Sequence, residues 1–127
     1  MDKSLTENKI FQERCRKLNV AGFKRHLLIC AGPKCCSPET GEKLWQFVKT
    51  RMKDLNLVNN DVFRTKAGCL RICQHGPVAL VYPEGTWYAK LDEQKCERII
   101  QEHLIDGMPV KEYAFAETKL FEESSES

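Results

Sequence analysis

The stretch that most constrains the fold is a strand pattern followed by a loop and a long amphipathic helix. Residues 23–30 end in a continuous apolar run, which is typical of a strand buried on both faces. Residues 31–38 contain one glycine and two prolines and therefore predict a loop. Ser37 before Pro38 is a favourable helix start, and apolar residues then recur every three or four positions as far as Leu55. This succession predicts a layered α/β fold.

The second half of the chain adds a short strand, a hairpin and another helix. Residues 61–66 predict a strand, and residues 78–82 and 86–91 predict two strands joined by a short Pro-Glu-Gly turn. Residues 92–107 predict a helix that begins at an aspartate cap and ends at a glycine. The first two strands require a right-handed crossover through the long helix. The order predicts a thioredoxin-like α/β fold with a mixed four-stranded sheet flanked by helices.

The 127 residues suit one domain with an extension at each end. Residues 6–18 predict an extra N-terminal helix, so we expect a helical arm over residues 1–22. The main domain should span residues 23–110. We expect residues 111–127 to form a C-terminal tail that is partly disordered, because its last residues are mostly glutamate and serine.

Seven cysteines are many for this length, and their number is odd. The first residues are polar and mixed in charge, unlike a secretory signal, and no apolar run approaches the roughly 20 residues of a membrane span. We therefore expect a cytoplasmic protein without membrane insertion, whose thiols stay reduced. A net charge of only +2 argues against a nucleic-acid binder. Metal, cluster or redox chemistry remains as the role of the cysteines.

Four of the cysteines form two pairs on predicted loops. Four residues separate Cys30 from Cys35, and three separate Cys69 from Cys73. Both loops follow strands predicted to be parallel neighbours, and open α/β sheets bind ligands beyond the carboxyl ends of their strands. Iron in 2Fe–2S clusters takes four thiolates, so these four residues are the predicted ligands. Cys36 adjoins Cys35 and stays an alternative second ligand.

Three segments of the chain resemble the thioredoxin-like 2Fe–2S ferredoxins and the small cluster-bearing subunit of respiratory NADH dehydrogenases and related hydrogenases. They are Cys30-Ala-Gly-Pro-Lys-Cys35, Gly68-Cys69-Leu-Arg-Ile-Cys73 and the hairpin from Gly76 to Tyr88. The resemblance covers about residues 23–110. It implies a one-electron carrier rather than an enzyme, with one 2Fe–2S cluster on the two cysteine pairs. It also implies transient contacts with redox partner proteins and a possible homodimer.

The remaining reactive residues are interpreted as supporting or packing groups. Cys15 and Cys96 lie on apolar helix faces and should pack in the core. His75 is the histidine nearest a cysteine loop and is expected beside the site rather than as a ligand. Basic residues near the loops would favour a reduced, more negative cluster: Lys34, Lys66, Arg71 and His75.

Three other functions fit part of the pattern. Four cysteines can hold zinc, but zinc sites usually use Cys-x-x-Cys spacing, which neither pair has. A thiol–disulfide enzyme would suit the fold but lacks the same motif. A cluster-bearing subunit of a larger oxidoreductase would keep the cluster and leave catalysis to other subunits.

Overall fold

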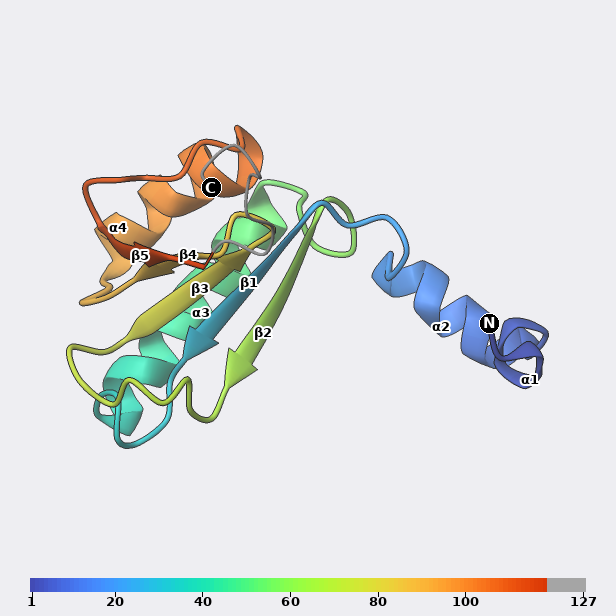
Figure 1. Ribbon diagram of the computed structural model, residues 1–127, viewed down its shortest axis with the longest axis horizontal. Helices are drawn as coiled ribbons and strands as arrows, with labels where there is room; N and C mark the ends of the chain where they lie inside the picture. Colours follow the sequence, from blue (N-terminus) through green and yellow to red (C-terminus); the bar gives the residue numbers. More distant parts are fainter. Residues whose placement is uncertain (119–127) are drawn as a thin grey trace, which may run out of the picture.

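The computed structural model describes residues 1–118 as a sheet backed by helices, with an N-terminal arm that projects from it (Figure 1). The strands are β1 (Arg25–Cys30), β2 (Val62–Ala67), β3 (Val78–Tyr82), β4 (Thr86–Tyr88) and β5 (Ala114–Glu117). The helices are α1 (Lys3–Thr6), α2 (Lys9–Leu18), α3 (Pro38–Asp54) and α4 (Glu93–Arg98). The last of these continues into the π-helical segment η1 (Ile99–Ile105).

The strand order across the described residues is β2-β1-β3-β4-β5. β1 is parallel to β2 and antiparallel to β3, and the two hairpin strands β3 and β4 are antiparallel. The predicted mixed α/β sheet of thioredoxin type is thereby confirmed. The parallel pairing has one consequence for function: β1 and β2 end at the same edge of the sheet, where Cys30 pairs with Ala67.

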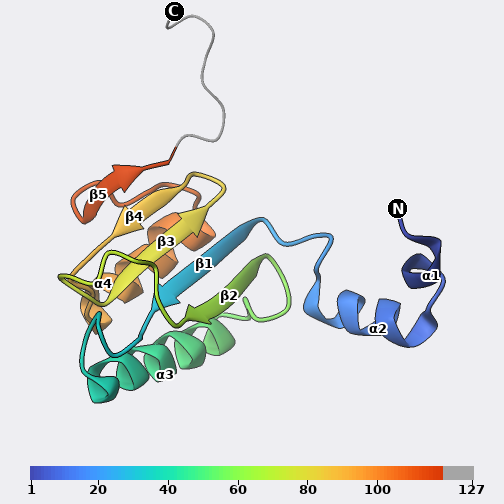
Figure 2. The same cartoon turned by 60° about the horizontal axis from the view of Figure 1, so that its bottom comes forward.

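Helix α3 and the continuous helix formed by α4 and η1 cover the same face of the sheet, as Figure 2 shows. The buried side chains of Leu27 and Ile29 from β1 meet Val48 and Met52 from α3 and Ile100 from η1 in one core. These β1 residues alternate with others that point to the opposite face, as the period of a strand requires. The core therefore holds β1 against α3. As a result, both ends of the loop that connects them are held in place.

The start of α3 follows the predicted capping pattern. The Ser37 hydroxyl accepts a hydrogen bond from the Thr40 backbone N–H at 3.1 Å, and Pro38 occupies the first turn. The predicted apolar stripe is buried, with Leu44, Val48 and Met52 facing the sheet. The helix thus begins at Pro38, three residues after Cys35.

The sheet of the described residues has five strands rather than the predicted four, because β5 lies in the segment expected to be a tail. Ala114 and Ala116 pair with Tyr88 and Trp87, and the Phe115 ring lies 6.3 Å from the Trp87 ring between centroids. A short apolar segment is therefore enough to extend the sheet. The predicted disorder of residues 122–127 lies outside the described residues.

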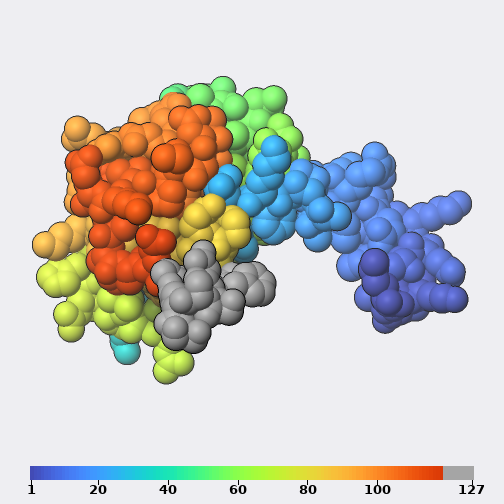
Figure 3. Space-filling view, turned by 45° about the horizontal axis from the view of Figure 1, so that its top comes forward, coloured from blue at the N-terminus to red at the C-terminus, as the bar shows by residue number. Residues whose placement is uncertain are grey.

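The N-terminal arm differs from the prediction in its details. Its main helix begins after Asn8, whose side chain accepts from the Phe11 N–H at 2.9 Å, and not after Thr6. Neither α1 nor α2 contains a buried residue. The space-filling view shows the arm standing away from the rest of the molecule (Figure 3). Across residues 1–118, no helix is long and apolar enough to cross a membrane.

Candidate metal centre

The first cysteine pair flanks the loop between β1 and α3. Cys30 is the last residue of β1 and is fully buried, and Cys35 is 8% exposed. The backbone folds back within the loop, because the Cys35 N–H donates to the Gly32 carbonyl at 3.1 Å. The two cysteines are joined by a disulfide, with their Cα atoms 6.7 Å apart.

The second pair lies in the loop that follows β2. The sulfurs of Cys69 and Cys73 are 3.8 Å apart, and the Arg71 backbone N–H donates to the Cys69 sulfur at 3.2 Å. Arg71, Cys73 and His75 have left-handed backbone conformations, with φ of 73°, 58° and 54°. Backbone that alternates in this way can aim several N–H groups at one anion. Sequence reasoning missed this feature, because none of the three positions is a glycine.

The two loops touch through their glycines. The Ala31 N–H donates to the Ala67 carbonyl at 3.2 Å, which extends the β1–β2 ladder into the loops. A Cβ atom on Gly32 would lie 1.9 Å from the Gly68 carbonyl oxygen, and one on Gly76 would lie 2.2 Å from the Cys35 carbonyl oxygen. Real Cβ atoms do not approach oxygen so closely, so the loops can meet only if these positions lack a side chain.

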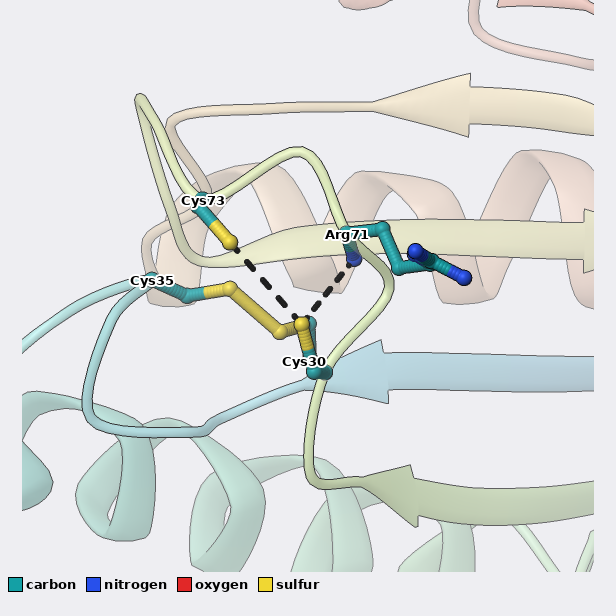
Figure 4. The surroundings of a disulfide bond; sticks show 5 residues. Cys30, Cys35, Arg71 and Cys73 are labelled. Carbon is teal, nitrogen blue, oxygen red and sulfur yellow. Dashed lines mark hydrogen bonds between the residues drawn. A yellow bond between two sulfur atoms is a disulfide. The ribbon is translucent and has the colours of Figure 1, made fainter.

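Figure 4 shows the sulfurs of Cys30, Cys35 and Cys73 directed into the same region between the loops. Within residues 1–118, however, no three histidine, cysteine or acidic side chains already stand in metal-binding geometry. The structure holds the four predicted ligands as two pairs, one of them oxidised. The two cysteine loops are in contact, but their sulfurs would have to move to bind one metal centre together. The donor set itself, four sulfurs on adjoining loops, has the composition that a 2Fe–2S cluster requires.

Cys36 lies between the buried cysteine pair and α3. Its sulfur lies 3.2 Å from the position that a Cβ on Gly41 would occupy, so the side chain rests against the first turns of α3. The same side chain packs, partly buried, against the cluster formed by Cys30, Cys35 and Val78. Burial raises the pKa of the Cys36 thiol.

The charges around the second loop act in opposite directions on Cys73. The contact with Cys69 and burial raise the pKa of the Cys73 thiol, whereas the nearby cations Lys34 and Arg71 oppose that rise. Lys66 instead forms an ion pair with Glu42 at 3.4 Å on the flank of α3. Of the predicted cations, Lys34 and Arg71 are therefore the ones that bear directly on the sulfurs.

The other cysteines and histidines differ in how well they were predicted. Cys96 is packed in the core as expected, and burial raises its pKa to about 12. The prediction that Cys15 packs in the core is wrong, because the helix that carries it does not pack against the domain. His75 lies in the second cysteine loop, where its carbonyl accepts from the Lys90 N–H at 2.6 Å. His103 is fully buried, with its ring nitrogens bonded to Tyr88 and Glu84.

No protein-family profile matches the chain. Among curated proteins, the chain is 38% identical over 94 residues to a Priestia megaterium protein whose name assigns it to the 2Fe–2S ferredoxins. That alignment covers 74% of this chain and 72% of the relative. A 2Fe–2S ferredoxin of Clostridium pasteurianum is 30% identical over 94 residues, with 69% of this chain and 92% of the relative covered.

A solved structure agrees with these relatives. The crystal structure of the thioredoxin-like [2Fe–2S] ferredoxin from Aquifex aeolicus superposes with a TM-score of 0.64 at 25% sequence identity. The superposition covers 75% of this chain and 99% of that protein. The sequence relatives and the structural neighbour are thus all named as 2Fe–2S ferredoxins.

Proposed function

Because this chain belongs to the thioredoxin-like 2Fe–2S ferredoxin family, we propose that it is a one-electron carrier with a single 2Fe–2S cluster. The proposed ligands are Cys30, Cys35, Cys69 and Cys73. When bound, such a cluster takes up one electron as one ferric ion becomes ferrous, and it gives the electron up again. The proposed setting is the cytoplasm, where the thiols that bind iron stay reduced.

The contact between the two cysteine loops is the observation that carries this proposal. β1 and β2 are parallel, so their carboxyl ends deliver Cys30 and the Cys69 loop to one edge of the sheet. The glycines at positions 32 and 76 let the backbones meet there. A thiolate, not a disulfide, binds iron, so the Cys30–Cys35 bond must be reduced before the cluster is loaded.

Cys35 is preferred to Cys36 as the second ligand because its sulfur already lies against the sulfur of Cys30. Cys36 packs against the same cluster from outside, with its sulfur beside Gly41 on α3, and stays the alternative ligand.

Burial of the first pair also weighs against a thiol–disulfide enzyme. Such an enzyme needs one accessible, activated thiolate to attack a protein disulfide. Cys30 is 0% exposed and Cys35 is 8% exposed, so the first pair is closed to a second protein. Cys69 of the second pair is exposed, but the contact between the two thiols raises the pKa of Cys73, which disfavours an activated thiolate there. The structure offers no comparable argument for zinc or for membership in a larger oxidoreductase.

Anaerobic purification with a thiol reductant, followed by iron and acid-labile sulfide analysis, tests the proposal. We expect two irons and two sulfides per chain, a reddish-brown colour and a rhombic electron-spin signal after one-electron reduction. A colourless protein without iron would end the proposal, and a protein that holds zinc without sulfide would replace it with a zinc site.

Serine variants then test the ligands one at a time. Replacing any one of the four proposed ligands should lower the iron and sulfide bound per chain or shift the visible spectrum, because one iron would lose a thiolate. Cys36→Ser and Cys96→Ser are the matched controls and should keep the full complement. Loss of the cluster in Cys36→Ser with retention in Cys35→Ser would transfer the ligand role to Cys36.

A further inference from the structure

Three loops meet at the edge of the sheet that carries the cysteines, and their charged side chains are mostly basic. The loops are residues 31–37, 67–77 and 89–92. Asp92 is the one acidic residue among them, and its side chain caps α4 by accepting from the Lys95 N–H at 2.7 Å. The cationic side chains are Lys34, Arg71 and Lys90, and all three are exposed. We call these three residues the basic rim.

Each member of the basic rim lies on a loop that belongs to or meets the second cysteine loop. Lys34 lies between Gly32, which approaches the Gly68 carbonyl, and Cys35, whose carbonyl approaches Gly76. The Arg71 backbone N–H donates to the Cys69 sulfur at 3.2 Å. Lys90 is joined to the same loop through its N–H, which donates to the His75 carbonyl. The three cations therefore surround one edge rather than scatter over the surface.

The basic rim is not neutralised from within the described part of the chain. Across residues 1–118, no carboxylate lies within 4.0 Å of the charged groups of Lys34, Arg71 or Lys90, in contrast to the neighbouring Lys66–Glu42 pair. Most protein surfaces mix charges of both signs. Ile72 adds an apolar side chain, 41% exposed, beside these cations.

We propose that the basic rim is the docking surface for an acidic patch on the protein that exchanges electrons with this chain. The inference rests on the proposed function. Two ferric ions, two sulfides and four thiolates carry two net negative charges, and three after reduction, which alone would repel an acidic partner. The three rim cations offset that charge at the exposed edge. Contacts of this kind are small and transient, and complementary charge mainly raises the rate of encounter.

Opposite effects on two small oxidants test the charge at this edge. The reduced holoprotein passes one electron to cobalt(III), which becomes cobalt(II), in the anionic EDTA complex or in the cationic hexaammine complex. The rim variant combines Lys34→Gln, Arg71→Gln and Lys90→Gln. At low ionic strength it should react about tenfold more slowly than wild type with the anion and faster with the cation. Both differences should shrink as salt is added.

The matched control combines Lys17→Gln, Lys53→Gln and Lys111→Gln, which removes the same charge from exposed sites away from the cysteine loops. It should keep the wild-type rates. Equal rates for the rim variant and wild type with the anionic oxidant, at intact iron content, would overturn the inference.

Binding of poly-L-glutamate to the cluster-free chain gives a readout that does not need iron. The rim variant should bind this acidic polymer at least several-fold more weakly than the control variant. If both variants bind it equally, the rim is not an acidic-surface site, whether or not the chain holds a cluster. If iron is absent but the difference in binding persists, the rim stands and the electron-carrier proposal falls.

Discussion

Gly32 is the residue on which the approach of the two cysteine loops most depends. A methyl group there would collide with the backbone oxygen of Gly68 at 1.9 Å, and backbone cannot swing aside as a flexible side chain can. Gly68 itself is different, since a Cβ added to it would meet no atom within 4 Å. The lack of a side chain is therefore required at Gly32 but not at Gly68, although the two residues face each other.

The first prediction follows from this asymmetry. Gly32→Ala should lower the free energy of unfolding by about 1–3 kcal/mol, the usual cost of overpacking. It should also reduce the iron bound per chain, because the loops are forced apart. Gly68→Ala should leave both quantities near wild type. Urea unfolding with iron analysis measures the two effects, and equal behaviour of the two variants would contradict the contact.

His103 shows how a buried titratable group can serve the fold alone. Its Nε2 lies 2.7 Å from a Glu84 oxygen that can only accept, so Nε2 carries the proton. Its Nδ1 then accepts from the Tyr88 hydroxyl at 2.8 Å, and that hydroxyl accepts from the Val110 N–H at 3.0 Å. Burial lowers the pKa of His103 despite the nearby Glu84 carboxylate, so the neutral ring is the folded form.

The second prediction concerns pH. The folded chain holds a proton on His103 less tightly than the unfolded chain, so the stability from the neutral ring is fully present above the ordinary value of 6.5. It is lost as the pH falls below that value, and the free energy of unfolding should decrease from pH 7.5 to 5.5. His26, whose pKa is also lowered by burial, contributes in the same direction. His103→Gln should flatten the decrease, and urea unfolding at several pH values measures it; an equally steep decrease in this variant would contradict the prediction.

At the site, residue types and spacing were enough to predict the cysteine loops, but not the backbone that shapes them. The residue types of the segment Leu-Arg-Ile-Cys do not predict the left-handed backbone conformations of Arg71 and Cys73. Such conformations are uncommon for residues with a Cβ and are imposed by the surrounding fold. The orientation of Cys36 likewise depends on its packing against Gly41, which no local pattern encodes.

At the level of elements, α3 combines a local signal with a structural role. Ser37 caps α3. It also lies between the adjacent cysteines, Cys35 and Cys36, and the first helical residue, Pro38. As a third prediction, Ser37→Ala should lower the free energy of unfolding by about 1 kcal/mol, and Ser37→Asn should restore it, because asparagine caps equally well. Thermal unfolding of the cluster-free chain measures this effect. An unchanged midpoint in Ser37→Ala would mean that the cap is dispensable.

The elements that were predicted well are those with a long repeating pattern. The buried run of β1 and the apolar stripe of α3 each extend over several residues, so their period is readable. β5 is only four residues long and is stabilised by its pairing with β4. The change from α4 to π-helical turns in η1 leaves the apolar face almost unchanged. Pairing and small changes of helical pitch are decided by tertiary contacts, which a local pattern does not contain.

At the scale of the molecule, the arm and the domain are nearly independent. α1 and α2 bury no residue, and just after α2 the Asn19 side-chain N–H donates to the Asn60 carbonyl of the domain. The fourth prediction is that a chain lacking residues 1–18 will unfold within about 0.5 kcal/mol of the full chain, as expected where no buried contact is removed. Chemical denaturation measures this difference. A larger loss would show that the arm packs on the domain in solution.

The amphipathic pattern of α2 predicted the helix correctly but could not say where it lies. The apolar residues of α2 have the spacing of a helix that covers a core: Ile10, Phe11 and Leu18. A helix whose apolar face is exposed can have the same spacing. Ile10 is 86% exposed. Packing of a terminal segment depends on whether the domain offers it a matching surface, which is a property of the whole fold.

The position of β2 at the border of the sheet has a bearing on how the protein behaves in concentrated solution. Among residues 1–118, no strand lies beside the outer side of its backbone along most of its length, and such an edge can recruit a strand from another molecule into an aggregate. Lys66 on this edge is paired with Glu42, whereas the Arg64 guanidinium lies over the Trp45 ring. Two copies that approached edge to edge would bring their Arg64 charges together, which works against the growth of an open sheet into a fibre.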